Sequence, residues 1–220
     1  MVRLGLALAG LLTLVSPTAA QAGSSPCAVL TGATTLSVQP HDPGLTYVLD
    51  RTEAEIERLN TRPLPPLFHL RGLTVYHMED RLDLKYRMAQ VGDGWCLMPT
   101  SVSVQVGFTD MTVYIDRKYP KDSCQRKAVA FHENKHVAIS YEELNAGLPR
   151  IQTDLQAALA AVALPIHVAE VKVGEKYLTD YFSYYLKRDF QEINNRMVTR
   201  NTNLDNPQEY ASISAMCPAW

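Results

Sequence analysis

The sequence lacks a dominant charge, and this bounds its partners. Its 21 basic and 23 acidic residues give a formal net charge of −2, and no basic stripe runs along any segment. A nucleic-acid partner needs such a positive footprint, so none is expected. After the first twenty or so residues, no apolar stretch approaches the roughly 20 residues that span a bilayer. No internal repeat or low-complexity segment is present either.

The beginning of the chain is typical of a secretory signal peptide. Arg3 supplies a positive charge, an apolar run follows over residues 4–15, and Ala20-Gln21-Ala22 is a small-x-small cleavage site. We therefore expect residues 1–22 to be removed near Ala22. Residues 23–220 would form one soluble domain that is secreted or periplasmic, without a membrane span.

Cysteine is scarce, with four residues in the whole chain: Cys27, Cys96, Cys124 and Cys217. An even number in an exported protein predicts two disulfides, for which three connectivities exist. We favour Cys96–Cys124 and Cys27–Cys217, which would join the strand region to a helix and the two ends to each other. The alternative is that Cys124 is a nucleophile activated at a helix N-terminus, which an oxidising compartment disfavours.

Alternating apolar residues predict strands in the first half of the domain, residues 23–120. Residues 73–79 and 82–89 are expected to form a hairpin about Asp80-Arg81, followed by strands over 102–106 and 111–116. The fold class predicted is α+β, with a small antiparallel or mixed sheet packed on a helix.

In the second half, residues 121–200, the spacing of apolar residues changes from the alternation of strands to the 3.6-residue period of helices. This half is therefore expected to be helical. Asp122 forms a capping box with Gln125 and opens a helix over 124–146, which Gly147-Leu148-Pro149 should end. Two further helices are expected over 150–163 and 167–198.

The first of these helices contains His132-Glu133-Asn134-Lys135-His136. Two histidines four residues apart lie one turn apart on the same helix face, so both imidazoles can bind one metal ion. Glu133 is placed to accept a proton from a metal-activated water, as in the H-E-x-x-H motif of zinc hydrolases. The motif therefore predicts a Zn²⁺ site with His132 and His136 as ligands and Glu133 as general base. The alternative is a solvated helix face that carries two histidines by chance.

Catalytic zinc needs a third protein ligand. If the helices fold back at residues 147 and 165, the histidines face roughly residues 167–172, so Glu170 is the first choice and His167 the second. Glu142 could serve only if the helix bent near Ile139. The segment 189–209 is the remaining alternative.

The run from Trp95-Cys96 through Ser123-Cys124 to the residues 132–137 resembles the bacterial secreted zinc-dependent proteases, a family defined by its own H-E-x-x-H helix. The resemblance implies a zincin-type peptidase. It does not extend to the metzincins, whose pattern requires Gly and His where this chain has Ile139 and Glu142. The downstream motif of thermolysin-like enzymes is missing as well.

The function expected from the sequence is an exported zinc-dependent metallopeptidase that hydrolyses peptide bonds in a protein or peptide substrate. Two alternatives remain open. One is a non-catalytic exported domain that binds a metal or a partner through the same helix. The other is a zinc hydrolase of cell-wall amide bonds.

Overall fold

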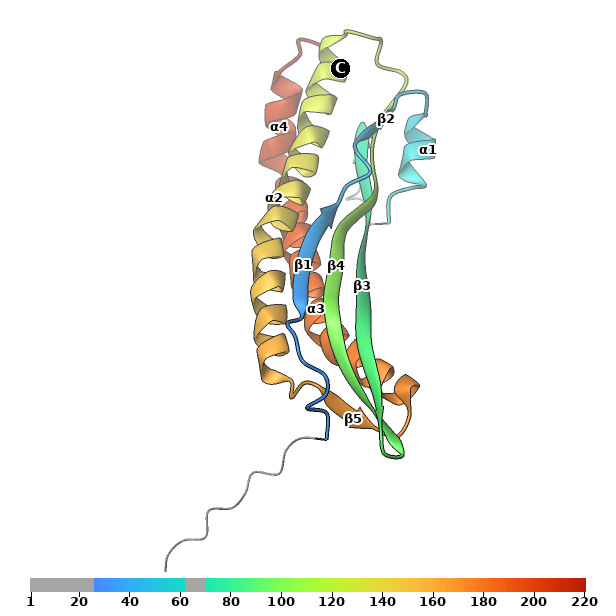
Figure 1. Cartoon of the computed structure of the whole chain (residues 1–220). Coiled ribbons are helices and arrows are strands. Elements are labelled where there is room, and N and C mark those ends of the chain that lie inside the picture. Colours follow the sequence, from blue (N-terminus) through green and yellow to red (C-terminus); the bar gives the residue numbers. More distant parts are fainter. Residues whose placement is uncertain (1–25, 62–69) are drawn as a thin grey trace, which may run out of the picture.

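The structure, a computed structural model, describes residues 26–61 and 70–220 and has an α+β architecture. A five-stranded sheet packs against two long antiparallel helices, α2 (Cys124–Ala161) and α3 (Val171–Leu204) (Figure 1). The predicted α+β class is therefore confirmed. The expected signal peptide, residues 1–22, lies outside the described residues.

One long central strand, β4 (Gly94–Ile115), organises the sheet. The strand β3 (Gly72–Val91), nearly as long, pairs with it in antiparallel fashion along its whole length. On the other side of β4, β1 (Thr35–His41) and β2 (Thr46–Val48) pair in parallel, and β5 (Ile166–Val168) pairs antiparallel.

The hairpin expected about Asp80-Arg81 is wrong. Both residues lie inside β3, opposite Val106 and Gln105 of β4, so the alternation on either side of them belongs to one strand of 20 residues. The chain turns instead at Gly92, whose φ of 63° is the left-handed conformation that glycine adopts without strain. Likewise, the two strands expected over 102–106 and 111–116 are parts of β4.

Helix α2 begins at Cys124, as expected, but its capping residue is not Asp122. Its N-cap is Ser123, whose hydroxyl accepts a hydrogen bond from the backbone N–H of Arg126 at 3.1 Å, whereas Asp122 precedes the helix with a φ of 64°. The choice of cap leaves the phase of the helix unchanged, because the following residues are helical in both cases.

The expected end of this helix at Gly147-Leu148-Pro149 is wrong, because α2 continues through Pro149 for a total of 38 residues. Gly147 provides close contact between helices rather than a terminus, since a Cβ built there would lie 2.3 Å from Ile193 of α3. Burial of Leu144 and Ile151 on either side of the proline offsets the backbone hydrogen bond that proline cannot make.

Helix α3 is longer than expected and antiparallel to α2, so its end reaches the first half of α2 (Figure 1). A short helix that the sequence did not predict, α4 (Pro207–Ala215), follows it. The helix α1 (Glu53–Glu57) begins with a capping box between Thr52 and Glu55. The core lies between the sheet and the two long helices, and its largest fully buried side chains include Phe108, Leu155 and Phe182.

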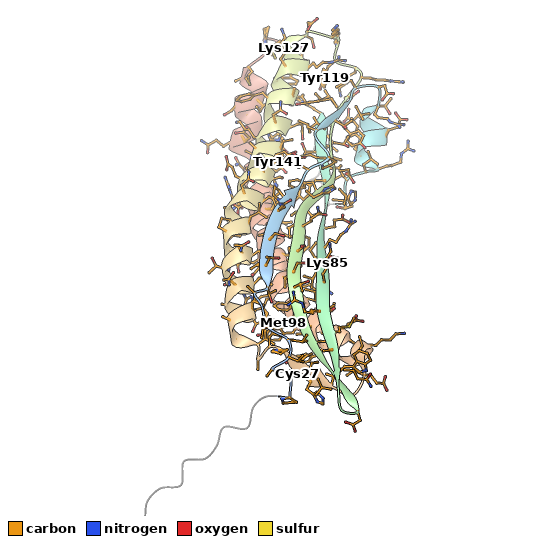
Figure 2. The ribbon with its side chains drawn as sticks, in the orientation of Figure 1. Cys27, Lys85, Met98, Tyr119, Lys127 and Tyr141 are labelled. Carbon is orange, nitrogen blue, oxygen red and sulfur yellow. A yellow bond between two sulfur atoms is a disulfide. The ribbon has the colours of Figure 1, made fainter. Side chains whose placement is uncertain are left out.

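The disulfides are Cys27–Cys96 and Cys124–Cys217, so the favoured pairing is wrong. The reason is the length of β4, which carries the chain about 60 Å from Cys96 to the end of the strand. Cys27 and Met98 accordingly lie at the opposite end of the molecule from Lys127 (Figure 2). Because Cys124 is bonded, its role as a reactive thiol is also excluded.

Candidate metal centre

Helix α2 turns three side chains of the motif toward the protein interior. His132, Glu133 and His136 are all buried, with exposed fractions of 5%, 4% and 8%. The two histidines face the end of α3 and the start of α4, and their Nε2 atoms are 3.2 Å apart. Glu133 faces β3. The motif is therefore part of the core, which argues against a solvated helix face.

A third potential ligand, Asp205, immediately follows the last residue of α3. Its Oδ1 lies 3.3 Å from His132 Nε2 and 3.1 Å from His136 Nε2. Bond lengths of 2.0–2.2 Å at a tetrahedral zinc place ligand atoms about 3.3 Å apart. Within the described residues, these three side chains form the group of histidine and carboxylate that could hold a metal ion, and their atoms fit one face of that tetrahedron.

Hydrogen bonds fix the tautomer of His136. The Ser140 hydroxyl donates to the His136 carbonyl at 2.8 Å and accepts from Asn201 Nδ2 at 3.2 Å. This orients the amide oxygen of Asn201 toward His136 Nδ1, at 2.9 Å. Nδ1 must therefore carry a proton, so Nε2, which points toward Asp205 and His132, is the atom that can offer a lone pair to a metal.

The other histidine is oriented by a carboxylate. His132 Nδ1 lies 3.4 Å from Glu209 Oε1, which also accepts a hydrogen bond from Lys135 Nζ at 2.6 Å. The bond from Lys135 is the main reason that the pKa of Glu209 is lowered, and His132 adds to it against the effect of burial. With Nδ1 donating to this carboxylate, the Nε2 lone pair of His132 also points into the triangle.

Asp205 enters the triangle as a carboxylate. Burial raises its pKa, but hydrogen bonds to His132 and His136 outweigh burial and hold the pKa far below the ordinary range. The Tyr210 hydroxyl donates to the same Oδ1 at 2.7 Å. The hydrogen bonds to Asp205 need a proton on an Nε2 atom, and a cation that replaces this proton would meet three electron-pair donors that lie 3.1–3.3 Å apart.

Glu133 is held beside this triangle by β3. Its Oε2 accepts a hydrogen bond from the Thr74 hydroxyl at 2.8 Å, while Oε1 accepts none from the described residues. Gly72 leaves room for the carboxylate, since a Cβ there would lie 2.7 Å from Oε1. Burial raises the pKa of Glu133 and outweighs the lowering by His136 and His132, which makes this carboxylate a stronger base than an exposed one.

The structure brings the three motif residues together but not the expected third ligands. Glu170 is the N-cap of α3, at the end of the molecule opposite the histidines, and His167 lies in β5 opposite Cys96 of β4. Glu142 points to solvent and pairs with Arg200 at 2.8 Å. The residue that the structure places with the two histidines is Asp205, in the segment that was the last alternative.

Sequence reasoning missed the side chains that orient the histidines and Asp205. Asn201, Asp205 and Glu209 are spaced four residues apart, and Asn206-Pro207 is a helix-start signal, with the asparagine side chain capping α4 at Glu209 N–H (2.9 Å). These signals predict a helix junction. They do not tell which helix the junction faces.

No protein-family model, curated protein or solved structure matches the chain. In the described part of the chain, none of the helices combines the length and apolar character needed to cross a membrane.

Proposed function

We propose that this chain is an exported zinc-dependent metallopeptidase. The observation that carries the proposal is the triangle of His132, His136 and Asp205 beside the buried carboxylate of Glu133. The resemblance of the motif region to bacterial secreted zinc-dependent proteases supports the same reaction class. The two disulfides fit an oxidising compartment outside the cytoplasm.

Each residue of the site has a distinct role in the proposed reaction. Zinc, when bound, acts as a Lewis acid that lowers the pKa of a bound water to about 7 and polarises a carbonyl. Asn201 and Glu209 hold the two imidazoles in the tautomer that offers Nε2. Thr74 fixes Oε2 of Glu133, so the free Oε1 accepts the proton of the attacking water and passes it to the amide nitrogen that leaves.

The test separates the ligands from the base. Metal analysis of the purified mature protein should find one zinc per chain, alongside cleavage in a broad peptide pool. Glu133→Gln should keep zinc and lose activity, His132→Ala should lose both, and the exposed Glu142→Gln should change neither.

Each alternative has its own result in this experiment. Equal loss of zinc in the Glu133 and His132 variants would show that Glu133 is not the base. Zinc binding without turnover of any peptide would favour a non-catalytic metal-binding domain. Turnover restricted to cell-wall amides would favour the amidase.

A further inference from the structure

A pocket of about 680 Å³ lies at the start of α2, away from the three ligands. Its lining comes from α1, from the residue just before β3, from the loop between β4 and α2, from the first turn of α2 and from Trp220. The residues that give it chemical character are Arg71, Lys118, Tyr119, Gln125 and Trp220.

Among the described residues that line the pocket, one cation is available to a ligand. Lys118 is neutralised by Glu53 at 2.6 Å and Asp116 at 3.1 Å. Arg71 has no carboxylate partner among the described residues. One of its N–H groups donates to Ser214 at 3.4 Å, and its guanidinium lies 4.0 Å from the ring centre of Trp220. A guanidinium has five N–H donors, so several remain for a ligand.

The remaining walls supply an apolar surface. The Tyr119 and Trp220 rings meet edge to face, with centroids 6.0 Å apart. Stacking between the guanidinium and the indole holds Arg71 beside the Trp220 ring. A cation in a fixed position beside two rings suits a carboxylate attached to an apolar group.

The pocket and the candidate metal centre both lie beside the start of β3 and the first turns of α2. Arg71 immediately precedes Gly72, which packs against the Glu133 carboxylate. Along α2, Gln125 of the pocket is eight residues from Glu133, or about 12 Å. An extended peptide covers this distance with about four residues.

We propose that this pocket binds a carboxylate of the peptide substrate through Arg71, about four residues from the bond that is cut. The carboxylate is either the C-terminus of a short peptide or an Asp or Glu side chain. This inference rests on the proposed peptidase function, but binding in the pocket can be measured without turnover.

Trp220 is a native reporter of the pocket, because Trp95 is the other tryptophan of the chain. In a Trp95→Phe background, fluorescence titration compares three acetylated tetrapeptides: alanine with a free C-terminus, the same peptide as its amide, and an amide ending in glutamate. A carboxylate should strengthen binding at least about tenfold over the neutral amide. Tighter binding of the peptide with the free C-terminus would identify the terminal carboxylate as the group that is bound. Tighter binding of the glutamate amide would identify the side-chain carboxylate.

Arg71→Met should abolish this preference, and Arg71→Lys should keep part of it. Lys85→Met is the control, because Lys85 lies in β3 far from the pocket (Figure 2) and should leave binding unchanged. Equal binding of acid and amide by the unmodified pocket, or an unchanged preference in both Arg71 variants, would overturn the inference.

Cleavage assays then separate this inference from the proposed function. Arg71→Met should raise KM about tenfold for peptides with the carboxylate, with kcat and zinc content unchanged. If no peptide is cleaved but the binding preference persists, the peptidase proposal fails and the pocket stands. If acids and amides are cleaved equally well by the parent and by Arg71→Met, the peptidase stands and the pocket assignment fails.

Discussion

Replacing Asp205 by asparagine should remove most of the zinc affinity while leaving the fold in place. Asparagine has the same shape, and its amide oxygen can still accept the hydrogen bond that Tyr210 donates to Oδ1 at 2.7 Å. The junction between α3 and α4 therefore keeps its local structure. What is lost is the charged oxygen that closes the triangle with the two histidines.

The size of the loss follows from the number of ligands. Four-ligand zinc sites bind with about 10–16 kcal/mol, so one ligand is worth about 3 kcal/mol, or roughly a hundredfold in Kd. Zinc at 100 times the parent Kd stabilises the folded chain by about 2.7 kcal/mol and should raise Tm by about 5–10 °C in a chain of this size. At the same zinc concentration the variant would gain about 0.4 kcal/mol and a shift near 1 °C.

The assay is competition for zinc with a chromophoric chelator at neutral pH, combined with thermal unfolding with and without the metal. Glu170→Gln is the control, since it removes the carboxylate that helix arithmetic first suggested and should leave affinity and Tm shift unchanged. An unchanged affinity in Asp205→Asn, or a hundredfold loss in Glu170→Gln, would refute the assignment of the third ligand.

Two further changes test the surroundings of the site. Gly72→Ala places a Cβ 2.7 Å from Glu133 Oε1 and should lower kcat by at least about tenfold with zinc content retained, as measured by parallel kinetic and metal assays. Glu143→Gln, which loses charged hydrogen bonds to Arg196 and Arg200, should cost about 2 kcal/mol in denaturant unfolding at pH 7. The hydrogen bond from Arg200 lowers the pKa of Glu143, with support from Arg196 and against the effect of burial. The stability that Glu143 contributes is therefore fully present above the pKa of the unfolded state, near 4.3, and is lost as pH falls through the lower pKa of the folded state. The control is the exposed Glu142→Gln, which should change stability by less than about 1 kcal/mol both at pH 7 and at acidic pH.

Features that depend on neighbouring residues in the chain could be predicted without the structure. The spacing of His132 and His136 fixes both on one helix face, and any helix containing them must present Glu133 beside them. The α+β class followed from a change of period near residue 121. These features depend on local geometry, which is why the motif residues could be named without a structure.

Local signals failed where distant packing opposed them. Gly147 and Pro149 are a strong sequence signal for a helix end, yet α2 continues because its flanking side chains are buried against α3. The backbone of β3 likewise continues through Asp80-Arg81 because β4 supplies partners along its whole length. In both places the long-range contacts outweigh the local preference.

The residue that faces the two histidines and the pairing of the cysteines depend on tertiary structure. The ligand estimate assumed a helix that ends at residue 147. In the unbroken α2, the histidines lie about 40 Å from the end of the helix, so α3 must run back about 27 residues to reach their level. That distance leads from Val171 to the neighbourhood of Asn201 and Asp205, not to Glu170. The wrongly expected helix end at residue 147 therefore shifts the predicted partner of the histidines by many residues, because each additional helical residue adds 1.5 Å along the axis.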